Sequence, residues 1–216
     1  MDPSILVTFA PLGGKVGFYF KDLATGEIFE KNGEMPLLAA SVIKLPVMAE
    51  AFRQMEAGLV GRAERFAIRP EDKLPGCGAL NELHDGLEVT FLDLVKLMIV
   101  LSDNTATNLV IRRLGMDAVN AYLTALGLAG TRLNRLLFDA EASARGIENR
   151  VSAADMGRLL EMIWRGELVS KEASAEMLGI LFAQRLGGKL PLSLPRHVDV
   201  ANKTGEDEGI TNDVGL

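Results

Sequence analysis

The pattern of apolar and polar positions places short strands at both ends of the chain and helices between them. Residues 15–21, KVGFYFK, alternate loosely and are followed by a turn and the run IFEK at 28–31, which predicts an antiparallel hairpin. Near the other end, HVDVANKT at 197–204, a turn at GEDEG and ITNDVGL at 210–216 predict a second pair of strands. This order is typical of an α+β domain, and we expect both chain ends to meet in one antiparallel sheet.

The segments between the strands have the apolar spacing of helices. Thr90, with Asp93 three residues later, forms a candidate capping box, and glycines follow several of the segments. Pro46 is tolerated in the first turns of a helix, so Ser41 should lie close to a helix start. Residues 68–86 and 130–150 predict loops, the second with a helical turn. The predicted helices are residues 41–57, 90–102, 102–115, 116–127, 152–166 and 170–184.

Length and composition fit one globular domain. The chain has 216 residues, of which 48% are hydrophobic, and contains neither an internal repeat nor a low-complexity tract. We expect a single domain over 1–216, with a sheet lobe formed by about 1–35 and 190–216 and a helical lobe formed by about 40–185.

The charge argues against two classes of partner. A net charge of −6 and a pI near 5.1 give no broad basic surface for nucleic acid or an anionic membrane. No apolar run is long enough for a membrane span, and the start lacks the pattern of a signal peptide. The single cysteine, Cys77, excludes an intrachain disulfide but does not decide the compartment.

Several kinds of catalytic site are disfavoured by what the sequence contains. The two histidines, His84 and His197, lack metal-ligand spacing, and no H-E-x-x-H, C-x-x-C, P-loop or G-x-G-x-x-G occurs. We therefore expect no metal and no organic cofactor, and no histidine-based triad.

Three short motifs remain: SVIK at 41–44, SDN at 102–104 and KTG at 203–205. S-x-x-K alone is a weak signal, since about one chance match is expected in a chain of this length. The three together carry more weight because SVIK begins a buried helix, SDN follows an apolar helix and KTG ends a predicted strand.

These motifs suit acyl transfer on a serine. A serine hydroxyl needs a base beside it, and Lys44 lies three residues after Ser41, on the same helix face. Lysine serves as a base when burial or a neighbouring cation such as Lys203 lowers its pKa. Helix N–H groups near Ser41 and the strand after KTG could stabilise an oxyanion. For SVIK alone, a helix cap and a surface charge are the simpler interpretation.

The three motifs, with the intervening LHDGLEVTFLDLVKLMIVLSDNTATN, resemble the class A β-lactamase and penicillin-binding serine hydrolase superfamily over nearly the whole chain. The resemblance implies an α/β/α sandwich of β-lactamase type, with the active site between a helical and a sheet lobe. It implies a small-molecule β-lactam or acyl substrate, and members of the family are usually exported. The implied site residues are Ser41 as nucleophile, Lys44 as base, Ser102 as proton shuttle, Asn104 for the substrate amide, and Lys203, Thr204 and Gly205 for the substrate carboxylate.

One departure from the family concerns removal of the acyl group. In the lactamases, a glutamate shortly after a T-R-L-[DN]-R stretch activates the deacylating water. Here TRLNR at 131–135 is followed by LLFDAEA, which puts Leu137 at the glutamate position. Asp139, and beside it Glu141, are the nearest carboxylates, and Asp139 is our candidate for the catalytic role. The simpler interpretation is that both are exposed loop charges.

A second departure concerns the sheet. The family continues after the KTG strand and its neighbour with another strand and a long helix. We therefore expect a C-terminally incomplete domain, whose sheet is completed by a missing segment or by a second chain.

Three functions remain open. The first is a β-lactamase-like hydrolase that opens β-lactams through an acyl-enzyme on Ser41, as in antibiotic resistance. The second is a D,D-peptidase-like or esterase-like protein with slow deacylation, and the third is a non-hydrolytic β-lactam-binding module.

Overall fold

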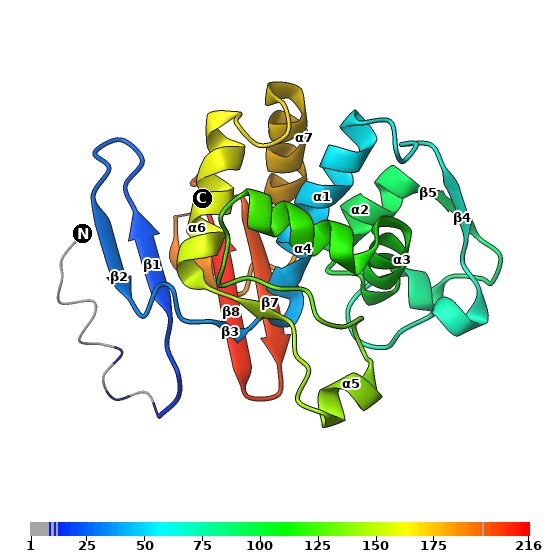
Figure 1. Cartoon of the computed structure of the whole chain (residues 1–216), viewed down its shortest axis with the longest axis horizontal. Coiled ribbons are helices and arrows are strands. Elements are labelled where there is room, and N and C mark those ends of the chain that lie inside the picture. Colours follow the sequence, from blue (N-terminus) through cyan, green and yellow to red (C-terminus); the bar gives the residue numbers. More distant parts are fainter. Residues whose placement is uncertain (1–8, 10, 12, 196) are drawn as a thin grey trace.

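The computed structural model describes residues 13–195 and 197–216, together with Phe9 and Pro11. It is a mixed helix and strand structure, which confirms the predicted α+β class. In Figure 1 the hairpin made by the N-terminal end lies at the left, the hairpin made by the C-terminal end lies in the middle, and a group of helices lies to the right of it. The helices are α1 (Lys44–Glu56), α2 (Phe91–Val100), α3 (Asn104–Leu114), α4 (Met116–Ala125), α5 (Ala140–Ala144), α6 (Ala153–Arg165) and α7 (Lys171–Phe182).

The strands pair as four separate antiparallel sheets of two strands each among the described residues. Two of these sheets are the predicted terminal hairpins, and the other two, each of two or three residue pairs, have no clear period in the sequence. The pairs are β1 (Phe18–Lys21) with β2 (Ile28–Lys31), β3 (Leu37–Leu38) with β6 (Arg150–Val151), β4 (Arg65–Ala67) with β5 (Glu88–Thr90), and β7 (Asn202–Asp207) with β8 (Ile210–Gly215).

The expectation that both chain ends share one sheet is not met in the described part of the chain. β1 and β8 do not hydrogen-bond to each other, and instead both pack against α6 (Figure 1). The C-terminal strand also begins later than predicted, at Asn202, and continues into the GEDEG segment as far as Asp207. Hydrogen bonding to Ile210–Gly215 therefore carries polar residues into strand structure, which an apolar pattern does not predict.

The predicted helix boundaries follow from their caps. Thr90 and Asp93 form the predicted capping box at α2, with the Asp93 N–H donating to the Thr90 hydroxyl at 3.1 Å. Ser152 and Ser170 accept from the third residue of α6 and α7 in the same way. Gly166 ends α6 in a left-handed conformation.

The core lies within the helical region. α1 is buried almost all round, with Val47, Met48 and Phe52 essentially inaccessible, and it packs on α2, α3, α4 and α7. This burial explains the nearly unbroken apolar text around Ser41, because the helix that follows this serine is the central element of the fold. Within the described residues, no helix combines the length and apolar character needed to cross a bilayer.

Two helical glycines give a matched test of how the N-terminal hairpin is attached. A Cβ on Gly157 of α6 would lie 2.4 Å from two ring carbons of Tyr19 in β1, whereas a Cβ on Gly179 of α7 would meet nothing within 4 Å. We expect Gly157→Ala to lower the free energy of unfolding by about 1–3 kcal/mol through overpacking. Gly179→Ala should raise it by up to about 1 kcal/mol through helix propensity.

Urea unfolding of both variants measures these changes. A Gly157→Ala protein as stable as Gly179→Ala would contradict the docking of β1 on α6.

Candidate active site

Ser41 lies in a 3-10 helix, Ala40–Ile43, that leads directly into α1. Its neighbours Val42 and Ile43 are buried in the core, while Ser41 itself is half-buried and lines a cavity of about 450 Å³. The Ser41 side chain makes no hydrogen bond within the described part of the chain, so its hydroxyl is available to a ligand. The core thus fixes the backbone of a serine whose side chain faces an open space.

Lys44 begins α1 one turn after Ser41, and its side chain is fully buried. The Nζ atom donates to the Ser102 carbonyl oxygen at 2.7 Å, to the Ser102 hydroxyl at 3.0 Å and to Asn104 Oδ1 at 2.8 Å. The structure therefore joins the SVIK and SDN motifs directly, and it excludes the alternative that Lys44 is a surface charge.

Lys203, the first residue of the KTG motif, is also fully buried and approaches Ser102 from β7. Its Nζ donates to the Ser102 hydroxyl at 3.0 Å and to the Thr204 carbonyl oxygen at 2.7 Å. One hydroxyl, that of Ser102, consequently lies between two buried amines.

Burial weakens the protonation of both lysines, and in each case a neighbouring cation adds to the effect. Burial, assisted by the positive charge of Lys203, holds the pKa of Lys44 well below its ordinary value. Burial lowers the pKa of Lys203 to about 7. The pKa of Lys44 is thus shifted in the direction that a lysine base requires.

The SDN motif also holds the loop on the opposite side of the cavity. Asp103 is buried, caps α3 through the Ala106 N–H, and accepts from the N–H groups of Ala79 and Leu80 at 2.7 and 2.9 Å. Gly78 packs so closely against Asp103 that a Cβ there would lie 2.4 Å from the carboxylate. Asp103 therefore places the loop that carries Cys77 at the mouth of the cavity.

Asn104 occupies the next position and lines the cavity itself. Its Nδ2 donates to the Pro75 carbonyl oxygen at 2.9 Å, and its backbone N–H donates to the Cys77 carbonyl oxygen. Its amide is consequently fixed with Oδ1 on Lys44 and one edge toward the cavity.

The KTG strand runs beside the 3-10 helix of Ser41. A Cβ on Gly205 would lie 3.0 Å from the Ala39 carbonyl oxygen and 3.1 Å from the Val42 nitrogen. Thr204 is nearly buried beside it, and the Gly205 carbonyl oxygen accepts from Lys189 Nζ at 2.9 Å. The absence of a side chain at residue 205 lets the strand backbone reach the region of Ser41.

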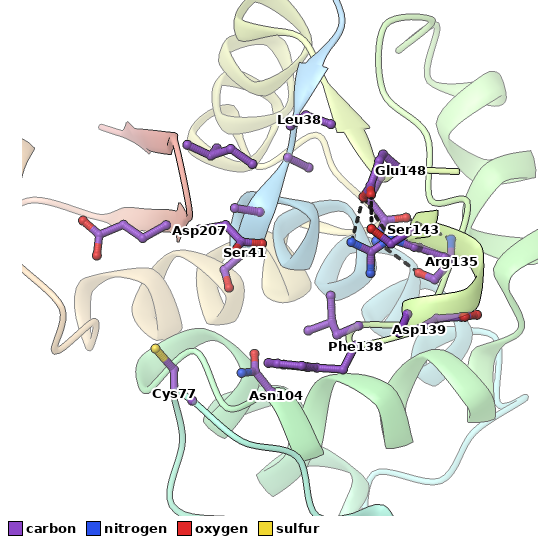
Figure 2. A pocket seen from close by; sticks show the side chains of 18 residues that line it. Leu38, Ser41, Cys77, Asn104, Arg135, Phe138, Asp139, Ser143, Glu148 and Asp207 are labelled. Carbon is purple, nitrogen blue, oxygen red and sulfur yellow. Dashed lines mark hydrogen bonds and ion pairs between the residues drawn. The ribbon is translucent and has the colours of Figure 1, made fainter. Parts of the chain in front are cut away.

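Residues 135–149 form the remaining wall of the cavity (Figure 2). Arg135 and Glu148 make an ion pair at 2.7 Å, and Ser143 donates to the other Glu148 oxygen. Burial alone would raise the pKa of Glu148, but hydrogen bonds from Ser143 and Arg135 bring it below its ordinary value. The Arg135–Glu148 ion pair thus connects the two ends of this segment.

Leu137, at the expected glutamate position, and Asp139, our candidate for the catalytic role, both lie in this wall. Leu137 is held by Asn108, which accepts from its N–H at 2.9 Å and donates to its carbonyl oxygen at 3.0 Å. Asp139 also lines the cavity, but its Oδ1 accepts from the Ala142 N–H and caps α5. Glu141 is exposed and pairs with Arg145.

Backbone strain gathers around the same cavity. Five non-glycine residues among those described have positive φ, and three of them, Ala40 (42°), Ser102 (53°) and Phe138 (60°), lie in the elements just described. Such conformations each cost on the order of 1 kcal/mol or more and persist where the surroundings enforce them. Ala40 and Phe138 line the cavity and Ser102 contacts Lys44, so their grouping supports the choice of this region as the candidate site.

Sequence reasoning did not find several residues that shape the site. Asn108 and Asn149 act through backbone hydrogen bonds that have no sequence signal, with Asn149 Oδ1 accepting from the N–H groups of Asn134 and Arg135. Phe138 lies in a stretch without a period, so the apolar pattern does not single it out. Among the described residues, no group of three or more His, Cys, Asp or Glu side chains could hold a metal ion.

Comparison with known proteins matches this arrangement to a family. The family model Beta-lactamase2, described as the beta-lactamase enzyme family, matches residues 4–216. The chain belongs to this family. It is 27% identical over 168 residues to a β-lactamase of Rhodobacter capsulatus, a match that covers 77% of this chain. The chain spans only 57% of the length of that relative.

Solved structures of a β-lactamase and of PBP-A have the same fold. A β-lactamase of Sphaerobacter thermophilus DSM 20745 is 35% identical, with a TM-score of 0.88 over 99% of this chain and 81% of that one. PBP-A is 30% identical, with a TM-score of 0.88 over 100% of this chain and 81% of that one. A leucine-to-glutamate variant of PBP-A, solved as an acyl-enzyme complex with penicillin G, is 31% identical, with a TM-score of 0.87 over 99% and 79% of the two chains.

The buried Lys203 predicts a pH-dependent stability. Its pKa is about 7 in the folded protein, against about 10.4 in an unfolded chain. Between these values the unfolded state binds more protons, so the free energy of unfolding should rise with pH. From pH 7 to 9 it should rise by about 1 kcal/mol per pH unit more in the wild type than in Lys203→Met.

Denaturant unfolding at several pH values measures this difference. Parallel pH profiles for the two proteins would contradict the lowered pKa of Lys203.

Proposed function

We propose that this protein is a serine hydrolase that opens β-lactams by forming an acyl-enzyme on Ser41. The observation that carries the proposal is the position of the Ser102 hydroxyl, 3.0 Å from each of two buried amines. One of these amines, that of Lys44, also contacts Asn104, which lines the same cavity as Ser41. A relative 31% identical to this chain has been seen as an acyl-enzyme with penicillin G.

The geometry supports Lys44 as the base. Of its three hydrogen-bond partners, the Ser102 carbonyl oxygen and Asn104 Oδ1 can only accept, whereas the Ser102 hydroxyl can also donate. A neutral Lys44 amine keeps two N–H donors for the first two partners. Its lone pair is then free to take a proton from a hydroxyl. This hydroxyl is that of Ser41 if Lys44 acts on the nucleophile directly, or that of Ser102 if Ser102 passes the proton on.

In the proposed acylation, the proton of Ser41 passes to Lys44, and a proton reaches the substrate nitrogen through Ser102. The Ser41 oxygen bonds to the lactam carbonyl carbon while its proton passes to Lys44. The C–N bond of the ring then breaks, and the ring nitrogen receives a proton from the Ser102 hydroxyl, which is replenished from the Lys44 ammonium. Electrostatic stabilisation of the carbonyl oxygen falls to backbone N–H groups where β7 passes the 3-10 helix.

Substrate binding is assigned to the residues around this path. Lys203, with Thr204 and Gly205, would hold the substrate carboxylate, because a cation with neighbouring donors suits an anion. Asn104 would bind the substrate amide from the cavity wall. The substrate is thus a small acyl compound with a carboxylate close to the reacting carbonyl.

Deacylation is expected to be slow. Leu137 offers no group to activate water, and Glu148 is engaged by Arg135 and Ser143. Asp139 is our candidate for the water-activating base, but one of its oxygens is committed to the α5 cap. This observation favours a second candidate function, a penicillin-binding or D,D-peptidase-like or esterase-like protein that releases its acyl group slowly.

Ser41 is the proposed nucleophile. Ser41→Ala should abolish the covalent adduct that intact-mass spectrometry detects after incubation with benzylpenicillin, because no other residue is proposed to be acylated. Cys77→Ala, which removes a thiol that also lines the cavity, should retain the adduct. An adduct on the Ser41→Ala protein would refute the assignment.

Asp139 is the candidate base for deacylation. Asparagine also caps helices well, so Asp139→Asn should keep α5 intact while removing the carboxylate. If Asp139 activates water, the lifetime of the adduct should lengthen at least about tenfold, since general-base catalysis contributes about a hundredfold or more. Time-resolved intact mass measures this lifetime, with Asp207→Asn as a control on the same cavity. An unchanged lifetime of the adduct in Asp139→Asn would refute the role of Asp139 as the water-activating base.

A further inference from the structure

Phe138 is an exposed aromatic residue at the rim of the cavity. Its exposed fraction is 54%, and among the described residues no other aromatic ring packs against it. It nevertheless lines the cavity, together with Ser41 and Asn104 (Figure 2). A large apolar side chain in this position has surface left to offer a ligand.

The backbone on both sides of Phe138 is fixed. Leu137 is held at its N–H and its carbonyl oxygen by Asn108, and Asp139 caps α5. Between these two anchors Phe138 adopts a φ of 60°, a region that bulky residues rarely enter. The fold therefore holds this ring at the cavity at an energetic cost, which is the behaviour of a functional position.

The ring lies next to the amide of Asn104. A Cβ built on Gly76 would be 3.8 Å from Phe138 Cζ and 3.1 Å from Asn104 Nδ2, so both groups lie within 4 Å of one point. Figure 2 shows the ring extending from the loop toward Asn104. The same wall is apolar around the ring, with Leu137 and Ala140 also lining the cavity.

We propose that Phe138 is a specificity-determining residue whose ring binds an aryl group on the acyl side chain of the substrate. This inference rests on the proposed function, in which Asn104 binds the substrate amide. The group attached to that amide then lies beside the ring, where an aryl group can stack on the ring face and bury area.

A pair of substrates that differ only by a phenyl ring isolates this contact. Phenylacetamido- and acetamido-penicillanate carry the same charge and the same lactam, so the ratio of their acylation kcat/KM values reports binding of the ring alone. In Phe138→Ala this ratio should fall about fivefold to tenfold, because kcat/KM of the phenylacetyl substrate decreases. The acetyl substrate should change less than about twofold.

Three further variants control the experiment. Phe138→Tyr keeps the ring and should keep the ratio of the two kcat/KM values. Phe138→Leu should lower this ratio nearly as much as Phe138→Ala, and it replaces the alanine variant if that variant does not fold. Phe182→Ala removes an exposed phenylalanine at the end of α7, outside the cavity, and should leave both substrates unchanged.

The outcomes separate this inference from the function on which it rests. A wild-type protein that forms no adduct with either substrate would refute acylation of Ser41 itself. An unchanged ratio in Phe138→Ala, with both substrates still reacting, would refute only the role of the ring. Equal losses for both substrates would also overturn it, because the ring would then serve the reaction generally and not the aryl group.

Discussion

The site depends on the burial of two amines around one hydroxyl. Lys44 comes from the first turn of the central helix and Lys203 from the C-terminal hairpin, yet both donate to the Ser102 oxygen at 3.0 Å. Two cations brought together without water are unfavourable, so the network forces at least one of them toward the neutral state. The free energy that the fold spends on their burial shifts the pKa of both amines in the direction that a base requires.

The remaining structure keeps this arrangement in place. The core around α1 fixes Lys44, while Asp103 ties the end of α2 to the loop on the far side of the cavity. Gly205 allows the strand that carries Lys203 to approach the Ser41 backbone. The segment joined by the Arg135–Glu148 ion pair forms a separate wall, in which Leu137, Phe138 and Asp139 line the cavity.

The sequence predicted those parts of the fold that depend on local chemistry. Helix ends at Thr90, Ser152 and Ser170 were predictable because a side-chain cap is read three residues away. The motifs also located Ser41, Lys44, Ser102 and Lys203, and the structure brings the last three into one network. The 3-10 turn at Ala40–Ile43 and the amide contacts of Asn108 were not predictable, since four residues show no period and a side chain that binds a distant backbone leaves no pattern. The separate packing of both hairpins on α6 was missed for a related reason, because apolar alternation identifies strands but not their neighbours.

The low pKa of Lys203 has a consequence for ligand binding itself. A carboxylate placed beside this amine would favour its charged form, so an anionic ligand that arrives above pH 7 must be accompanied by a proton from the solution. Association would then carry the ionisation enthalpy of the buffer, and affinity would decline as the solution becomes more alkaline. If Lys203 holds the substrate carboxylate as proposed, capture of the substrate anion is coupled to the uptake of a proton.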